Sequence, residues 1–187
     1  IAKPTDLNGK RLGAPGFDAG RKAFPIFAKA NNIAGVQWTS MDPPLRETML
    51  VKGDVDAITG FYFTSLLNLN ARGIKDEDVD VMMYPKYGVN LYGNAIIVSE
   101  QFLKEKPEAV KAFLRAFTKG MKDVLADPDA SIKFVKERDA LVDETLEKRR
   151  MKLAIDSVVV TPEAKADGLG AVQPARLNDM VTQVSSA

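Results

Sequence analysis

The feature that most limits what this chain can fold into is a regular alternation of strand-like and helix-like segments in its first part. Apolar strand-like runs at 10–14, 35–39 and 55–59 each precede a helix-like segment, at 19–31, 43–52 and 64–72. Short turns such as Pro15-Gly16 separate the segments. This order with short connections is typical of a parallel sheet covered by helices. We therefore predict an α/β lobe over residues 1–92, with a further strand at 79–83 and a linker at 84–92.

The pattern changes at Gly93. One apolar strand-like run, 94–98, is followed by helix-like segments only, with starts marked by Ser99, Pro107, Asp127, Asp143, Pro162 and Pro174. A single strand cannot form a sheet, because its backbone groups would lack hydrogen-bonding partners. Either 94–98 pairs with the first lobe, or its partners are missing from the chain.

Composition restricts the possible chemistry. With 26 basic and 25 acidic residues the net charge is +1, so no overall field attracts nucleic acid or an anionic membrane. The chain contains no histidine and no cysteine, which removes the commonest general base, the commonest metal ligand and all thiolate chemistry. We expect no catalytic residue, no metal site, no cofactor and no nucleic-acid partner.

Three stretches carry a resemblance to a known family. They are Pro-Thr-Asp-Leu-Asn-Gly-Lys-Arg-Leu-Gly at 4–13, Met-Leu-Val-Lys-Gly-Asp-Val-Asp-Ala at 49–57, and Ser-Glu-Gln-Phe-Leu-Lys-Glu-Lys-Pro-Glu-Ala-Val-Lys-Ala-Phe-Leu at 99–114. In this order and spacing they resemble the substrate-binding proteins of ABC importers of the nitrate, sulfonate and taurine type. Their relatives that bind thiamine pyrimidine precursors share the same pattern. The resemblance covers essentially the whole chain and begins partway through the family's chain.

The resemblance implies an α/β, two-lobed type II periplasmic binding protein fold, with the second lobe complete and the first partial. Residues 1–92 would be the inserted second lobe, and 93–187 the mainly helical C-terminal portion of the first. In that case 94–98 has unpaired edges and the helices of 93–187 expose apolar faces. The implied function is capture of a small molecule between the lobes for an ABC transporter permease. It implies a periplasmic, or lipid-anchored extracellular, protein that meets the membrane complex only peripherally.

The loop after the first predicted strand is one candidate site. Ligands of open parallel sheets bind at the carboxyl ends of the strands, beside helix N-termini. Here Gly16, Phe17, Asp18 and Ala19 lead into a helix that carries Arg21. The alternative is that Asp18 only caps the helix and Phe17 packs in the core. A carboxylate at this place disfavours a bare anion, unless Arg21 offsets its charge.

The loop after the third predicted strand is a second candidate, with Gly60 followed by the aromatic residues Phe61, Tyr62 and Phe63. Consecutive side chains cannot all point inwards, so one aromatic ring should face a ligand and stack on it. We favour Tyr62; in the alternative the two phenylalanines are core and Tyr62 is surface. The pyrimidine-precursor binders would carry a carboxylate shortly after this aromatic, and Leu66 follows instead. The ligand class stays open.

The predicted crossing between the lobes is a third candidate. Gly88 and Gly93 are suited to a hinge that absorbs backbone rotation, and Tyr92 and Asn94 are within reach of a ligand there. An ordinary irregular loop is the structural alternative.

Two other functions are compatible with such a fold. One is an enzyme like the fungal synthase of the thiamine pyrimidine, which consumes its own histidine; this chain has none. The other is the effector-sensing domain of a transcription regulator, which would follow a helix-turn-helix that is not visible in this sequence.

Overall fold

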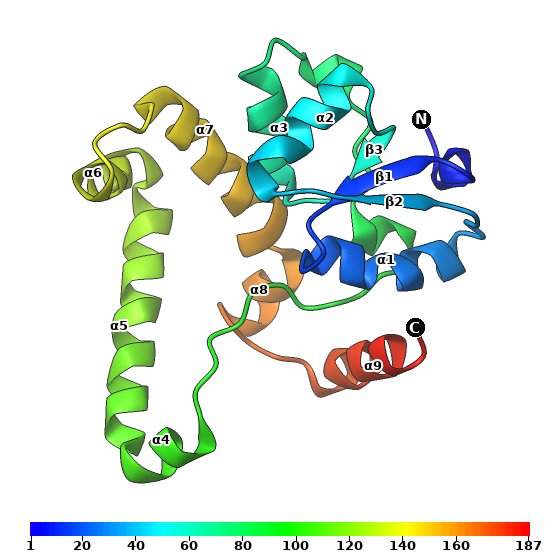
Figure 1. Ribbon diagram of the computed structural model, residues 1–187. Helices are drawn as coiled ribbons and strands as arrows, with labels where there is room; N and C mark the ends of the chain where they lie inside the picture. Colours follow the sequence, from blue (N-terminus) through cyan, green and yellow to red (C-terminus); the bar gives the residue numbers. More distant parts are fainter. The chain divides into compact units, whose positions relative to one another are not determined.

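The computed structural model describes residues 1–187, and its internal contacts divide the chain into two compact units (Figure 1). Unit 1 comprises residues 1–92 and 172–187, and unit 2 comprises residues 93–171. The division at 92/93 coincides with the change in sequence pattern. Residues 172–187, which we had grouped with the other C-terminal helices, pack on unit 1 instead.

Unit 1 is built on a small parallel sheet with strand order β2-β1-β3. Its strands are β1 (Arg11–Ala14), β2 (Gln37–Ser40) and β3 (Ala57–Ile58). Leu12 of β1 is paired with Trp38 on one side and Ala57 on the other. The predicted α/β organisation with a parallel sheet is therefore confirmed. The strand predicted at 79–83 is wrong: Val79 has extended backbone angles, but the segment joins no sheet.

Helices surround this sheet, and most begin where the sequence predicts. The elements are η1 (Pro4–Leu7), α1 (Ala19–Ala30), η2 (Pro43–Leu45), α2 (Arg46–Lys52), α3 (Tyr62–Asn70), η3 (Asp76–Asp78), η4 (Tyr84–Tyr87) and α9 (Pro174–Ser185). The α2 helix ends at Gly53, whose φ of 76° lies in the left-handed region that glycine adopts without strain. The α3 helix starts at Tyr62, two residues earlier than predicted, and so includes the tyrosine that we had placed in the preceding loop.

The core of unit 1 lies between the sheet, α1 and the segment that follows η3. Phe27 of α1 is 1% exposed. Its ring stacks on Tyr84 at 4.9 Å between centroids and meets the edge of Tyr87 at 5.8 Å. Val89 belongs to the same buried cluster. The stretch 84–92, predicted as a linker, therefore packs as part of the core because its aromatic and apolar side chains face α1.

Arg11 and Asp56 join the start of β1 to the segment before β3. Arg11 donates from its side chain and its backbone N–H to the Asp56 carboxylate, at distances of 2.8 to 3.2 Å. The pKa of Asp56 is lowered to about 2, mainly by the hydrogen bond from the Arg11 side chain and next by the one from the Arg11 backbone N–H. In the folded state the Asp56 carboxylate therefore stays ionised over a pH range in which an aspartate of the unfolded chain is protonated.

We predict an acid-dependent contribution of Asp56 to stability. Because its pKa is lower in the folded state, the contribution is complete above about pH 4 and is lost as the pH falls through about 2. The unfolding temperature of the native chain should therefore fall more steeply between these pH values than that of Asp56→Asn, measured by circular dichroism. Asp42→Asn is the control, since Asp42 is exposed and its side chain makes no capping bond. Equal slopes for the native chain and Asp56→Asn would contradict the assignment.

Unit 2 is helical throughout. It contains α4 (Glu100–Glu105), α5 (Pro107–Ala126), α6 (Pro128–Arg138), α7 (Glu144–Ala154), the π-helical turn η5 (Ile155–Val159) and α8 (Pro162–Asp167). Ser99, Asp127 and Asp143 each accept a hydrogen bond from a backbone N–H in the first turn of the helix that follows, as predicted. No helix of the chain is long and apolar enough to cross a membrane.

Residues 94–98 do not form the predicted strand, because no second strand in unit 2 offers its backbone a partner. Ile97 is 89% exposed. The expectation of exposed apolar helix faces is confirmed: Phe113 and Phe117 of α5, which stack on each other at 6.2 Å, are 55% and 47% exposed.

Candidate functional site

The candidate site lies in unit 1, at the carboxyl ends of the three parallel strands. The loop after β1 enters α1, the loop after β2 leads through η2 into α2, and the loop after β3 enters α3. Parallel strands bring these three loops to one edge of the sheet, and ligands of α/β proteins bind at such an edge. The side chains of the loops are joined there by a network of polar contacts.

Asp18 lies at the centre of this network. Its Oδ1 atom accepts hydrogen bonds from the backbone N–H of Arg21 at 2.8 Å and from the hydroxyl of Thr59 at 2.7 Å. Its Oδ2 atom lies 3.5 Å from the guanidinium of Arg46. Asp18 therefore caps α1, as one of our two alternatives had it, and also ties the β1 loop to the end of β3 and to α2. Because these partners occupy both oxygens, Asp18 acts as a cross-link between the loops.

Arg21 links β1 to β2 from the other side of the same loop. Its guanidinium donates to the hydroxyl of Ser40 at 2.8 Å and to the carbonyl of Ala14 at 3.3 Å, and it lies 4.8 Å from the centre of the Trp38 ring. The sequence left open whether this arginine offsets the charge of Asp18. In the structure the guanidinium that approaches the Asp18 carboxylate is that of Arg46, and Arg21 points to β2.

Arg46 and Glu47 form a buried pair that the sequence did not reveal as part of the site. Glu47 is 1% exposed and Arg46 9%. The guanidinium donates to one carboxylate oxygen of Glu47 at 3.2 Å and 3.1 Å. In the sequence the two residues look like ordinary charges in the first turn of a helix. Their partner Asp18 is 28 positions away from Arg46, so no local pattern indicates the contact.

Gly60 covers this pair closely. A Cβ atom at Gly60 would lie 2.9 Å from Cζ of Arg46 and 2.4 Å from the hydroxyl oxygen of Ser65. That oxygen is buried and has no hydrogen-bond partner. The glycine therefore allows the backbone after β3 to lie directly against Arg46 and Ser65, which is the close approach expected of a glycine in a binding loop.

The aromatic residues of these loops are largely exposed. Phe17 is 74% exposed, so the alternative that it packs in the core is wrong. Phe61 is 50% exposed and stacks on Phe63 at 5.5 Å. Tyr62 is half-buried at the first position of α3, and its predicted contact with a ligand stays a prediction. Two phenylalanine faces are thus available beside the polar network.

The remaining predicted residues lie elsewhere. The hydroxyl of Tyr92 accepts a hydrogen bond from the backbone N–H of Gln173 at 2.9 Å, and the guanidinium of Arg176 lies 4.2 Å from its ring centre. Tyr92 thus contacts α9, and Asn94 belongs to unit 2. The structure joins the predicted residues of the first two loops, Gly16 to Arg21 and Gly60 to Tyr62, through the contact of Asp18 with Thr59.

Tyr84 supports the first turn of α1. Its hydroxyl donates to the carbonyl of Gly20 at 2.8 Å. Burial, and to a smaller extent the negative charge of Asp18, raise the pKa of the Tyr84 phenol above its usual range. The phenol is therefore a permanent donor, and it holds the turn that carries the capping group Asp18.

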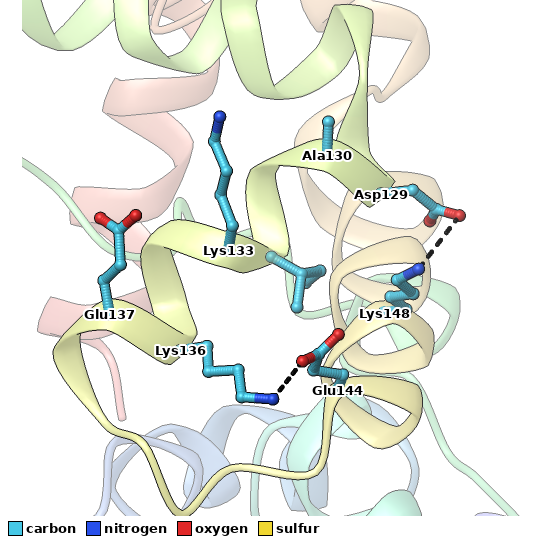
Figure 2. Close-up of a pocket in the computed structure, with 8 residues that line it drawn as sticks. Asp129, Ala130, Lys133, Lys136, Glu137, Glu144 and Lys148 are labelled. Carbon is cyan, nitrogen blue, oxygen red and sulfur yellow. Dashed lines mark hydrogen bonds and ion pairs between the residues drawn. The ribbon is translucent and has the colours of Figure 1, made fainter.

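A hollow lies in unit 2, between α6 and α7, with a volume of about 570 Å³ (Figure 2). Figure 2 shows two ion pairs between the two helices: Lys148 with Asp129 at 3.8 Å, and Lys136 with Glu144. No aromatic side chain lines it. Four of its six charged side chains form these two pairs, and without an aromatic ring the hollow offers a planar ligand no face to stack on.

Comparison with known proteins gives three matches. A family profile described as NMT1/THI5 like matches residues 1–131. The riboflavin-binding protein RibY of Chloroflexus aurantiacus is 29% identical over 143 residues, covering 73% of this chain and 40% of its own. The formylaminopyrimidine-binding protein of Halalkalibacterium halodurans is 28% identical over 133 residues, covering 69% of this chain and 39% of its own. The chain thus spans about two fifths of the length of these curated relatives.

Proposed function

The chain belongs to the NMT1/THI5-like family, and from this membership we propose that it is part of a substrate-binding protein of an ABC importer. In this proposal it binds a small molecule without converting it chemically. The two similar proteins are both named as binding proteins. The absence of histidine and cysteine agrees with binding, since any catalysis would have to rely on carboxylates, lysines and tyrosines.

One observation carries the proposal. The contacts of Asp18 with Thr59 and Arg46, and of Arg21 with Ser40, fasten the three strand-end loops of unit 1 to one another. Phe17 and Phe61, one in each of two loops, are left exposed. A rigid polar base with exposed aromatic faces is an arrangement that binds a ligand at little cost in ordering entropy.

The charges of the base favour an uncharged, planar ligand. In this network the carboxylates of Asp18 and Glu47 balance the guanidinium groups of Arg21 and Arg46, so the formal charges sum to zero and a bare anion meets no excess positive charge. The exposed phenyl rings offer apolar faces on which a heteroaromatic ring can stack. Riboflavin and formylaminopyrimidine, after which the two similar proteins are named, are therefore the first ligands to test. In the importer the ligand would be held between two lobes, and unit 1 would be the second of these lobes. The protein would lie outside the cytoplasm and would pass the ligand to a membrane permease.

We predict that Phe17→Ala and Phe61→Ala each weaken binding of such a ligand by about threefold to tenfold, because each removes one aromatic face. The chain has one tryptophan, Trp38, whose ring contacts Arg21 in the polar network. Quenching of its emission during titration with riboflavin or formylaminopyrimidine measures the affinity.

The matched control is Phe134→Ala in unit 2, where the ring is 60% exposed but lies far along the chain from the strand-end loops. Its affinity should equal that of the native chain. Binding that is lost with Phe134→Ala and kept with both Phe17→Ala and Phe61→Ala would place the ligand elsewhere. An absence of quenching by any planar ligand would overturn the proposal.

A further inference from the structure

The C-terminal helix α9 belongs to unit 1 (Figure 1). None of its residues is fully buried, and Arg176, Met180 and Gln183 are half-buried. Its apolar residues Leu177, Val181 and Val184 are 39%, 54% and 58% exposed. In most helices of globular proteins, burial of an apolar face supplies the attachment. For α9, polar contacts of the half-buried side chains supply much of the attachment.

Gln183 provides the first of these contacts. Its side-chain amide donates to the carbonyl of Gly88 at 3.2 Å and accepts from the backbone N–H of Asn90 at 3.0 Å. One side chain thus satisfies the backbone on both sides of Val89, as a neighbouring strand would. No strand of the sheet pairs with residues 88–90.

The start of α9 provides the others. Arg176 donates to the carbonyl of Leu91 at 3.1 Å, and its guanidinium lies 4.2 Å from the ring centre of Tyr92. The backbone N–H of Gln173 donates to the Tyr92 hydroxyl at 2.9 Å. These contacts fall on residues 88–92, the last residues of unit 1 before the chain leaves it. At the other end of the helix, Lys29 of α1 donates to the carbonyl of Ser186 at 3.5 Å.

The opposite side of the same segment packs on α1. Val89 is 2% exposed, and the side chain of Asn31 donates to the carbonyl of Tyr87 at 2.9 Å. Gly88 has a φ of 89°, and a Cβ there would lie 3.2 Å from Cβ of Ala30. The segment is thus held by burial on the α1 side and by polar contacts on the α9 side.

We propose that α9 is a polar clasp that fastens the exit segment 88–92 of unit 1 to the point where the chain re-enters it at Gln173. Because no residue of α9 is fully buried, the clasp opens locally while the core of unit 1 stays folded. With the clasp closed, backbone rotation between the units begins at Gly93 and not within the tract 87–92. This inference does not rest on the proposed function.

The test is amide hydrogen exchange, resolved by residue with nuclear magnetic resonance. The backbone N–H of Asn90 donates to the Gln183 side chain. In Gln183→Ala the hydrogen of this N–H should exchange about threefold to tenfold faster, the effect of losing one hydrogen bond. Tyr92→Phe keeps the ring beside Arg176 and removes the hydroxyl that accepts from the backbone N–H of Gln173. The exchange rate of that N–H should rise by a similar factor. Asn178→Ala, on an exposed position of the same helix, is the control and should change neither amide.

Two results would overturn the clasp. One is unchanged exchange at Asn90 in Gln183→Ala and at Gln173 in Tyr92→Phe. The other is an equal rise at the amides of α1, such as Phe27, since α9 would then unfold together with the core and would not open by itself. Faster exchange confined to 88–92 and α9 supports the proposal.

Discussion

Replacing Arg46 by alanine is expected to lower the free energy of unfolding of unit 1 by about 3–5 kcal/mol, the usual effect of removing one partner of a buried ion pair. Glu47, with a side chain only 2% exposed, would keep its charge without a partner, and Asp18 would lose the nearby guanidinium. The measurement is urea unfolding followed by Trp38 emission, because the single tryptophan lies in unit 1.

Two further variants distinguish the effect of the buried pair Arg46–Glu47 from the effect of an exposed ion pair. Lys75→Ala breaks an exposed pair with Glu77 in unit 1, in which the side chains are 72% and 75% exposed, and should cost less than about 0.5 kcal/mol. The double variant Arg46→Met with Glu47→Leu removes both buried charges and should regain most of the loss. A loss below about 1 kcal/mol for Arg46→Ala would mean that Glu47 is not buried in solution, and would remove the rigid base from the candidate site.

Local signals in the sequence predicted most of the helices. Ser99, Asp127 and Asp143 cap the helices that they precede, because a capping group and the N–H that it accepts from lie three positions apart. The order of strands and helices in 1–73 likewise predicted the parallel sheet. Such features need no knowledge of distant contacts.

Features that depend on distant partners could not be predicted. Residues 94–98 are as apolar as a buried strand, yet no neighbouring strand exists in unit 2, and the segment stays exposed. The stretch 84–92 looked like a linker because Gly88 interrupts any periodic pattern. Its partners Phe27 and Gln183 lie far away in the sequence, so only the folded chain reveals that it packs between α1 and α9.

The candidate site shows the same limit. Asp18 and Arg21 were identified because they follow a predicted strand directly. Thr59, 41 positions from Asp18, and Arg46, 28 positions away, complete the network. These contacts give Asp18 the role of a cross-link that fixes the loops, and its predicted contact with a ligand stays a prediction.

Phe27→Ala is the second change with a large expected effect, a loss of about 3–5 kcal/mol in the free energy of unfolding. Phe27 is 1% exposed and contacts the rings of Phe24, Tyr84 and Tyr87. Alanine would leave a cavity between α1 and η4. Tyr84 also holds the first turn of α1 through Gly20, so the loss reaches the loop that carries Asp18.

The matched control is Phe17→Ala, which removes the same side chain where it is 74% exposed. It should change the unfolding free energy by less than about 0.5 kcal/mol, while weakening ligand binding as predicted above. Phe27→Leu keeps most of the buried volume and should recover more than half of the loss. Equal losses for Phe17→Ala and Phe27→Ala would contradict the assigned core, because one ring would then be as well packed as the other.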